Sequence, residues 1–554
     1  MKTKRWLQSL LLVSTVVLIG ACSNDKTKDA DKGKDSGAKT EKVAKFGIPQ
    51  EVSSIDPAIA TDKVSFGVLN QIYEGIYRVD KDNKAVPAGA VDMAKVSDDG
   101  LVYEVELRDD AKWSNGDAVT AHDYVYGWQR VANPDTGAEY GYLFESVKNG
   151  ADILEGKKKP EELGIEAIDD THLKITLDTP VPYFNSLLAF PSFFPVNQKA
   201  VEEFGGDFAS SSEHAVYNGA FVLDEFDGPG SDIEWKYLKN PDYWDKDNVK
   251  IDEVQALVVK EASTAANLFE DGQLDDVIVT GELAQQYKEH ENFVGENDGR
   301  TIYVEMNRKD KESPFNNLNL RKAFSYAIDS ESVVNNVLGD GSKIATGLVP
   351  GQLATNPDTG EDFAEESKDY KEYDPEKAKE FYEAALKELK VDKVTFDILT
   401  DDNDSTKKIA EYIQGAFKDT LGIETTVTAV TKPIRLQRTS AGDFEMVLGG
   451  WGADYNDVSS FLDLFVTDGS YNKGKYSSEK YDDLIKQSKF DNATKPTERW
   501  QNFLDAEEVL LGEDYALIPV YQVVEGHLRN PEMKNYIAHS AGASYDYKFL
   551  EMTE

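Results

Sequence analysis

Cysteine is nearly absent from this chain, and the motifs of common enzymes are missing as well. The single cysteine, Cys22, excludes a disulfide within the chain. There is no Gly-x-Ser-x-Gly elbow, no P-loop and no His-Glu-x-x-His motif, while the acidic segments 80–83 and 401–404 lack the EF-hand glycine and terminal glutamate. The six histidines are too scattered to suggest a metal cluster: His122, His172, His214, His290, His527 and His539. We therefore predict no enzyme activity, no cofactor and no bound metal.

Positive charge is also in short supply. The chain has 60 lysines and arginines against 102 aspartates and glutamates, which gives a net charge of -42 and a pI near 4.5. Such a surface repels nucleic acid and anionic lipid, so neither is expected as a partner. With 554 residues, 40% of them hydrophobic, the chain exceeds the size that one core serves, and two or three domains are expected.

The N-terminus has the features of an export signal. Lys2, Lys4 and Arg5 precede an apolar run at residues 10–20, which is too short to span a bilayer but suits a signal peptide. The segment Ile19-Gly20-Ala21-Cys22 that ends this run resembles a bacterial lipobox, in which cleavage before the cysteine exposes it for lipid attachment. The expected partner at this end of the protein is therefore a membrane, held through a lipid anchor.

We predict a signal peptide at residues 1–21, a lipidated Cys22, and a tether at residues 22–42. The tether is rich in lysine, aspartate, glycine, serine and threonine, and it has too little apolar surface to offset the entropy lost on ordering. The folded body is expected to begin near Val43.

The most informative stretch of the body is residues 444–465. Phe444, Met446 and Leu448 alternate with their neighbours as in a mostly buried strand, which the next two glycines are expected to end while letting another backbone come close. Trp451, Gly452, Ala453, Asp454 and Tyr455 then follow.

Two interpretations of Asp454 are open at this point. A carboxylate beside aromatic residues at the end of a strand is well placed to receive a ligand's ammonium group. Alternatively, Asp454 caps or turns into a core helix, since Phe461, Leu462 and Phe465 have helical spacing.

The preceding segment predicts an α/β unit. Asp374 and Pro375 are suitable for the start of a helix, and the apolar face follows at Ala378, Phe381, Tyr382, Ala385, Leu386 and Leu389. Strand patterns around residues 394–398 and 423–427 flank a second helix pattern at residues 409–417. This β-α-β order leads into the strand at Phe444 and favours an α/β lobe.

Nine short segments follow one another along the chain: Ile55-Asp56-Pro57, Glu74-Gly75, the run from Arg108 to Arg130, Pro180-Val181-Pro182-Tyr183-Phe184, Tyr217-Asn218-Gly219-Ala220-Phe221, Asn240-Pro241-Asp242-Tyr243-Trp244, Pro314-Phe315-Asn316, Ala327-Ile328-Asp329 and Gly450-Trp451-Gly452-Ala453-Asp454-Tyr455-Asn456. In this order they resemble one known family, the oligopeptide-binding lipoproteins of bacterial ABC importers (large extracellular solute-binding proteins, family 5). The resemblance extends from about Phe46 to about residue 550.

The resemblance implies an α/β fold like that of type II periplasmic-binding proteins, with two α/β lobes joined by crossing strands and an extra domain inserted in the first. By alignment of these segments, lobe I comprises residues 43–73, 199–302 and 525–554. The inserted domain comprises residues 74–198, and lobe II comprises residues 303–524.

The function implied is capture of oligopeptides between closing lobes and delivery to an ABC permease, whose ATPase subunits are other chains. The protein is expected to be a monomer at the cell membrane, on the extracellular face of a Gram-positive-type cell or on the periplasmic side. An alternative within the family is a receptor for one signalling peptide, such as a pheromone. Other relatives bind nickel, haem or sugars, and these ligands also remain open.

The resemblance also assigns site residues. Asp454 pairs with the peptide's α-ammonium, Trp451 forms part of a side-chain pocket, and the backbone of Gly450, Gly452 and Ala453 pairs with the peptide main chain. Three further positions line the cleft in relatives, although each residue type is also common in packing: Tyr140, Thr280 and Tyr303.

The chain departs from the family at the peptide's C-terminus. Arginines that meet the C-terminal carboxylate in some relatives are replaced by Thr439 and Leu448, and Arg435 and Arg438 are the nearby substitutes. A second pocket tryptophan is replaced around residues 432–433. Ligand length therefore stays open.

Overall fold

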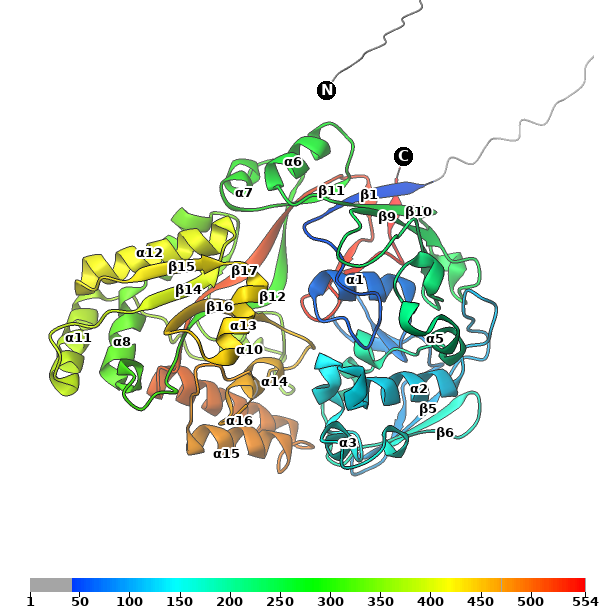
Figure 1. The fold of residues 1–554 in the computed structure, drawn as a ribbon, viewed down its shortest axis with the longest axis horizontal. Coiled ribbons are helices and arrows are strands. Elements are labelled where there is room, and N and C mark those ends of the chain that lie inside the picture. Colours follow the sequence, from blue (N-terminus) through cyan, green and yellow to red (C-terminus); the bar gives the residue numbers. More distant parts are fainter. Residues whose placement is uncertain (1–41, 470, 554) are drawn as a thin grey trace, which may run out of the picture. The chain divides into compact units, whose positions relative to one another are not determined.

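A mixed sheet of 11 strands organises the computed structural model, which describes residues 42–469 and 471–553 (Figure 1). The predicted signal peptide, Cys22 and all but the last residue of the predicted tether lie outside these residues. The folded body begins at β1 (Val43–Ile48), as expected. Within the described ranges, no helix is long and apolar enough to cross a membrane.

The strands of the large sheet follow an order that differs strongly from their order in the chain. From one edge to the other they are β15 (Thr426–Val430), β14 (Asp397–Asp401), β16 (Met446–Gly452), β12 (Phe293–Met306), β17 (Leu517–Arg529), β11 (Asp276–Val279), β1, β10 (Glu253–Val258), β9 (Glu234–Lys239) and β8 (Phe221–Asp224), with β13 (Lys343–Ile344) paired to β17. Both parallel and antiparallel neighbours occur, which confirms the mixed α/β character expected from the sequence.

Smaller sheets and helices complete the described structure. The second sheet contains β4 (Lys95–Val96), β5 (Val102–Glu106), β7 (His172–Thr176) and β6 (Ile165–Ala167), and two-stranded sheets pair β2 (Tyr77–Val79) with β3 (Ala85–Pro87), β18 (Met533–Lys534) with β21 (Glu551–Met552), and β19 (Ile537–Ala538) with β20 (Tyr545–Asp546). The α-helices are α1 (Lys63–Ile72), α2 (Ala121–Ala132), α3 (Gly150–Leu154), α4 (Phe184–Leu187), α5 (Gln198–Phe204), α6 (Ala262–Glu270), α7 (Gly281–Tyr287), α8 (Leu318–Ala327), α9 (Ser330–Ser332), α10 (Phe363–Glu366), α11 (Pro375–Leu389), α12 (Asp404–Leu421), α13 (Lys432–Ala441), α14 (Ser459–Leu462), α15 (Glu479–Lys489) and α16 (Pro496–Glu507).

The β-α-β unit predicted from the sequence is present. Asp374 caps α11, where its carboxylate accepts the backbone N–H groups of Glu376 and Lys377, and Pro375 occupies the first turn. Strand β14 then leads through α12 to β15, and β14 pairs in parallel with both β15 and β16. At the start of α2, the Thr120 N–H donates to the Asp123 side chain at 2.7 Å, as in a capping box.

One predicted strand end was wrong. The strand expected to stop at Gly449 continues to Gly452, because pairing with β12 extends to the end of β16. Helix α1 ends at Ile72, and the Glu74 N–H just beyond it donates to the side chain of Asn218.

Strands β12 and β17 carry the chain between the two ends of the large sheet. They are 14 and 13 residues long, and the predicted lobe borders at 302/303 and 524/525 fall inside them. Their pairing breaks between Asn297 and Thr301, and Gly299 within this break has a φ of +53°. Irregular pairing of this kind bends a strand, so the break is a suitable place for a hinge.

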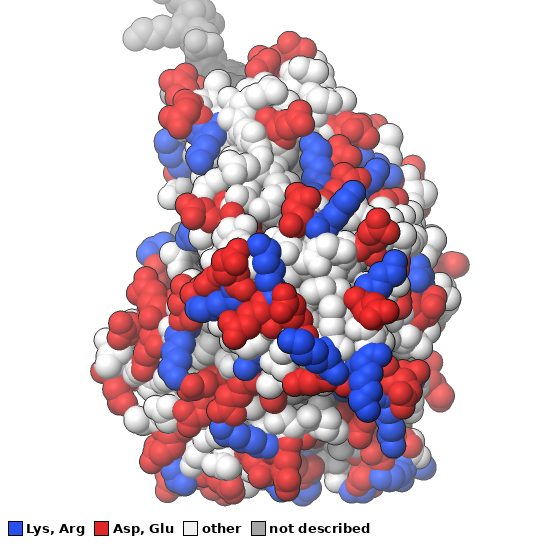
Figure 2. Space-filling model, turned by 90° about the vertical axis from the view of Figure 1, so that its left-hand side faces the viewer, with Lys and Arg blue, Asp and Glu red and all other residues white. Residues whose placement is uncertain are grey.

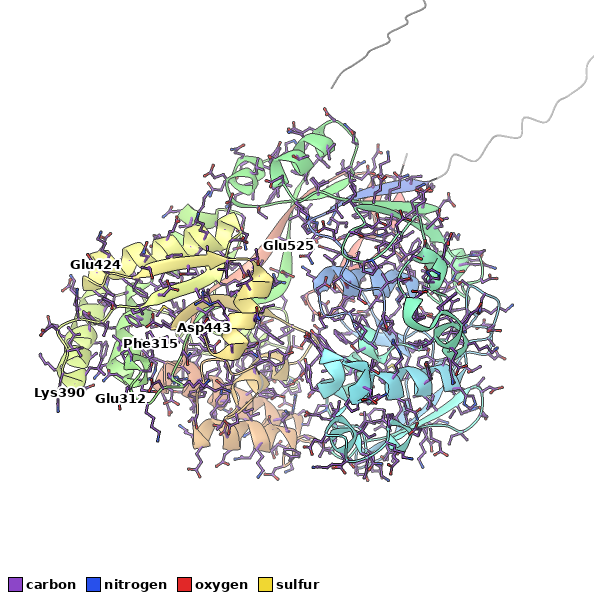
Figure 3. The ribbon with its side chains drawn as sticks, viewed as in Figure 1. Glu312, Phe315, Lys390, Glu424, Asp443 and Glu525 are labelled. Atoms are coloured by element: carbon purple, nitrogen blue, oxygen red, sulfur yellow. The ribbon has the colours of Figure 1, made fainter. Side chains whose placement is uncertain are left out.

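Buried and half-buried charged side chains surround this break. Lys63 of α1 donates to Asp298 of β12, and to Glu525 of β17 at 3.0 Å. Figure 3 labels Glu525 on β17, where it pairs with Glu296 of β12. Two residues further along β17, His527 is 1% exposed and its Nδ1 lies 2.8 Å from Asp276 of β11. Through its two hydrogen bonds, Lys63 connects α1 to both β12 and β17.

The apolar core does not follow the predicted domain borders. One continuous cluster of buried side chains includes Ile72 and Trp235 from predicted lobe I and Trp113 and Trp128 from the predicted insert. Separate clusters lie within residues 302–521 and 303–541. The domain division itself stays a prediction, but the insert and lobe I share a core.

The acidic composition is visible on the surface. On the face shown in Figure 2, aspartate and glutamate side chains are spread widely, with lysines and arginines among them rather than apart. This mixture suits a solvated acidic surface.

Candidate functional site

Asp454 lies two residues beyond the end of β16, with its carboxylate between two tyrosines. The Tyr140 hydroxyl donates to its Oδ1 at 3.1 Å, and the Tyr142 hydroxyl donates to its Oδ2 at 3.3 Å. Over residues 42–469 and 471–553, no lysine, arginine or histidine forms an ion pair with this carboxylate. Burial raises the pKa of Asp454 to about 6, and the two phenol donors oppose this rise. A half-buried carboxylate without a cationic partner is suited to a cation from a ligand.

Backbone contacts fix the position of Asp454. Its N–H donates to Ser460 Oγ at 3.0 Å, and the helix that follows, α14, starts only after Val458. Asp454 therefore does not cap that helix, but it lies in the bend that leads to it, and the helix is buried at Phe461 and Leu462, as the turn form of that alternative predicted. Ala453, directly before it, donates its N–H to Gly299 O at 3.0 Å and accepts from Gly542 N at 3.0 Å. The Ala453 N–H is consequently already used inside the protein.

One edge of β16 is open at the end that leads to Asp454. On one side β16 pairs with β12 over its whole length, from Met446 to Gly452. On the other side it pairs with β14 only at Met446 and Val447, and no other described strand continues this pairing. The edge from Leu448 to Gly452 thus offers backbone groups to an extended chain.

Glycine is required at Gly450. A Cβ there would lie 2.7 Å from the carbonyl oxygen of Thr301 on the paired strand. The close approach of another backbone, which the sequence predicted, therefore occurs on the β12 side of β16.

Aromatic rings connect Trp451 to Tyr140. The Trp451 ring meets Tyr471 edge-on with centroids 4.7 Å apart, and Tyr471 lies 5.9 Å from Tyr142. Tyr142 lies 5.7 Å from Tyr140, which stacks on Phe190 at 5.4 Å. This aromatic arc (Trp451, Tyr471, Tyr142, Tyr140 and Phe190) joins predicted lobe II to the predicted insert beside the Asp454 carboxylate.

Thr280 and Tyr303 occupy different surroundings. Thr280 is exposed at the start of α7, where its side chain makes no capping hydrogen bond. Tyr303 is 8% exposed on β12, packs edge-on against Phe465 at 5.9 Å, and has its pKa raised by burial. Neither of them is hydrogen-bonded to Asp454, so a role in the cleft remains a prediction for both.

The two substitute arginines differ in position. Arg435 of α13 donates to Asp401 Oδ1 at 2.6 Å, and its Nη1 lies 3.4 Å from where a Cβ on Gly449 would be. Arg438 instead bonds to Asp443, which Figure 3 labels on the loop between α13 and β16. Only Arg435 is therefore at the open edge of β16.

Two site residues were missed by the sequence analysis. Tyr142 was passed over although the Tyr-Gly-Tyr spacing on a short 3-10 helix (Glu139–Phe144) lets both phenols reach one carboxylate. Tyr471 comes from a loop with no pattern that signals its contact with Trp451.

Further contacts join the predicted insert to predicted lobe II next to Asp454. Tyr183 stacks on Tyr455 with centroids 4.4 Å apart, and the Asn456 side chain donates to the carbonyl of Asn83 at 2.6 Å. A cavity of about 520 Å³ lies beyond them, lined in part by Asn83, Asn456 and Trp500. In the part of the chain that the structure describes, no group of three or more His, Cys, Asp or Glu side chains is arranged to hold a metal ion.

Comparison with known proteins identifies the family of this chain. The family model described as "Bacterial extracellular solute-binding proteins, family 5 Middle" matches residues 77–473. The "Dipeptide-binding protein" of Lactococcus lactis subsp. cremoris is 36% identical over 92% of this chain and 95% of its own length, and the "Dipeptide-binding protein DppE" of Bacillus subtilis is 35% identical over 97% of each.

Solved structures agree with these matches. "Listeria monocytogenes OppA bound to peptide" has a TM-score of 0.82 and 40% identity, covering 93% of this chain and all of that one (100%). The pheromone receptor PrgZ has a TM-score of 0.83 and 38% identity with the same coverage. The α/β fold of the type II periplasmic-binding class is thereby confirmed, and the chain belongs to the family 5 bacterial extracellular solute-binding proteins.

Proposed function

We propose that this protein captures oligopeptides outside the cytoplasm and delivers them to the permease of an ABC importer. The observation that carries the proposal is the lone carboxylate of Asp454 at the end of the open edge of β16. A peptide has the complementary features, since it carries a cation at its N-terminus and a main chain that pairs with a strand edge.

In this arrangement the α-ammonium binds Asp454 and the peptide main chain lies along Gly450, Trp451 and Gly452. A hydrogen bond to a charged group contributes on the order of 1.5 to 3 kcal/mol, which is enough to fix the register of the ligand. Pairing through backbone groups accepts many sequences, because every peptide has the same backbone. Trp451 and its neighbour Tyr471 form one wall for a ligand side chain.

The lobes would close over the ligand because the residues that contact it come from different parts of the chain. The ligand's cation would meet Asp454 from predicted lobe II and the phenols of Tyr140 and Tyr142 from the predicted insert. A ligand shifts a conformational equilibrium only by binding one state better than the other, and contacts from both sides supply that difference. Movement between lobe I (43–73, 199–302 and 525–554) and lobe II (303–524) would occur at β12 and β17.

The cellular setting is part of the proposal. Cys22 would carry the lipid after removal of residues 1–21, and residues 22–42 would tether a monomeric body to the outer face of the cell membrane or to its periplasmic side. Two acyl chains suffice for stable anchoring. The protein would perform no chemistry and need no cofactor, because the ATPase subunits of the importer supply the energy.

A second candidate function is a receptor for one signalling peptide. The pheromone receptor PrgZ is 38% identical to this chain over 93% of it, so the fold serves that purpose as well. The two functions differ in how many peptides the protein accepts.

Native mass spectrometry tests the proposal. The mature chain from Ser23 onward would be purified from cells and offered a mixture of free and N-acetylated peptides of graded length. Heterogeneous bound masses that exchange for free-amine peptides are expected. One tightly retained peptide would favour the signalling receptor, and the absence of any bound peptide would contradict both functions.

A further inference from the structure

Tyr142 makes a contact that the resemblance to the family did not assign. Its hydroxyl donates to Oδ2 of Asp454 at 3.3 Å, while Tyr140 holds Oδ1 at 3.1 Å. Each carboxylate oxygen thus accepts one phenol, and each retains a further lone pair for a ligand. The two tyrosines lie on one 3-10 helix, so they reach the carboxylate together.

The Tyr142 ring is held from a second side. Tyr471 meets it at a 65° interplanar angle with centroids 5.9 Å apart, and Tyr471 in turn meets Trp451 at 66°. Edge-to-face pairs of this kind are favourable beyond the burial of the rings. The phenol of Tyr142 is therefore directed at Asp454 by packing as well as by its hydrogen bond.

The groups that face Asp454 make these donors important. They are the phenols Tyr140, Tyr142 and Tyr471, with Tyr455 next in the chain and His539 across a small adjoining cavity. Glu139, on the same 3-10 helix as Tyr140, is a neighbouring charge of Tyr140 and Tyr471. The described residues provide no ion-pair partner for the carboxylate, so the phenols supply the stabilisation of its charge. Burial by contrast favours the protonated acid, and that form cannot pair with an ammonium group.

We propose that Tyr142 is a positioning residue of the ligand-cation site: its phenol, braced by Tyr471, keeps the Asp454 carboxylate ionised and oriented for the ligand's ammonium. This inference rests on the proposed function. It assigns Tyr142 an electrostatic role in ligand binding in addition to its place in the aromatic arc.

The test is the pH profile of peptide affinity. Isothermal titration of the mature chain with tetra-alanine between pH 5 and 9 should give a bell-shaped profile. Its acid limb reports ionisation of Asp454, and its alkaline limb reports loss of the proton from the peptide's amino group, which has a pKa near 8. Removing a donor to the carboxylate raises its pKa, so Tyr142→Phe should move the acid limb to higher pH by about one unit. The alkaline limb should stay in place.

Two further variants make the result decisive. Tyr471→Leu removes the brace and should move the acid limb in the same direction by less, which also covers the case in which Tyr142→Phe does not fold. Tyr103→Phe removes a buried phenol of the predicted insert that does not contact Asp454, and should leave both limbs unchanged.

The outcomes separate the inference from the proposed function. An acid limb that coincides in wild type, Tyr142→Phe and Tyr471→Leu would overturn the role of Tyr142, as would a uniform loss of affinity at every pH. If the wild-type protein does not distinguish tetra-alanine from N-acetyl-tetra-alanine, the ammonium contact itself is wrong. A protein that makes this distinction but shows no shift in Tyr142→Phe refutes the inference alone.

Discussion

Replacing Asp454 with asparagine should weaken peptide binding and stabilise the unliganded protein at the same time. The variant keeps the shape of the side chain but removes its charge. Loss of one charge-assisted hydrogen bond, on the order of 1.5 to 3 kcal/mol, corresponds to roughly 10-fold to 150-fold weaker binding of a free-amine peptide. An N-acetylated peptide has no ammonium to lose, so its affinity should change little.

The stability effect follows from the pKa. Asp454 has a pKa of about 6 in the folded protein against the ordinary 3.8, so ionisation opposes folding at neutral pH. The difference between these two pKa values lowers the unfolding free energy at neutral pH by roughly 1 to 3 kcal/mol, after allowance for the remaining solvent contact of the side chain. Because the raised pKa belongs to an acid, this penalty is fully present above pH 6 and disappears as the pH falls through 6 towards 4.

The assay combines calorimetric binding of paired free and N-acetylated peptides with thermal unfolding at pH 7 and pH 4. Asp454→Asn should unfold at a higher temperature than the wild type at pH 7, and the difference should shrink at pH 4. Tyr103→Phe, distant from the carboxylate, serves as the control. Unchanged discrimination between the two peptides in Asp454→Asn, or a lower unfolding temperature at pH 7, would refute the reasoning.

Three further predictions concern the sheet and its crossing strands. Gly450→Ala should lower the unfolding free energy by about 1 to 3 kcal/mol in thermal or urea unfolding, because its Cβ would lie 2.7 Å from a backbone oxygen of β12. Lys63→Met should lower the unfolding free energy by about 1.5 to 3 kcal/mol in the same assay, since it removes the cation shared by Asp298 and Glu525 while Arg300 stays 3.6 Å from Asp298. The carboxylates around buried His527 raise its pKa above the ordinary value. The protonated imidazole should therefore stabilise the fold fully below pH 6.5, and this stabilisation should disappear as the pH rises through the folded pKa. Urea unfolding at a series of pH values should show the loss, and in His527→Asn the unfolding free energy should depend less on pH.

Matched substitutions separate these effects from general sensitivity to mutation. Gly415→Ala lies on α12 with open space around the new Cβ, so it should not destabilise the protein. Lys408→Met breaks an exposed pair with Glu282 and should change stability by less than about 1 kcal/mol. His122 is exposed, and His122→Asn should leave the pH dependence of unfolding intact. A control that matches its test variant would contradict the corresponding prediction.

Local sequence patterns correctly predicted those elements that neighbouring residues determine. The cap at Asp374 and the β-α-β unit were predicted because a few neighbouring residues determine each of them. The end of β16 was mispredicted because pairing with β12 outweighs the strand-breaking tendency of glycine at Gly449 and Gly450. That pairing involves residues about 150 positions away and leaves no mark in the local sequence.

The candidate site was also only partly predictable from the sequence. The aromatic and acidic residues after the Phe444 strand pointed to Asp454, and the family resemblance added Tyr140. The contact of Tyr471 with Trp451 depends on a loop whose course no periodic pattern determines. The irregular pairing near Gly299, likewise, requires knowledge of which strands meet.

The core shared by predicted lobe I and the predicted insert limits both the relative movement of these two parts and the removal of the insert by engineering. Trp113 and Trp128 pack in the same apolar cluster as Ile72 and Trp235, so residues 74–198 cannot shift against lobe I without opening that core. The predicted insert would then work as a rigid arm of predicted lobe I, and the proposed closure would involve two moving bodies instead of three. For the same reason, the segment cannot be excised or transplanted as a module, because its removal would leave both pieces with exposed tryptophans.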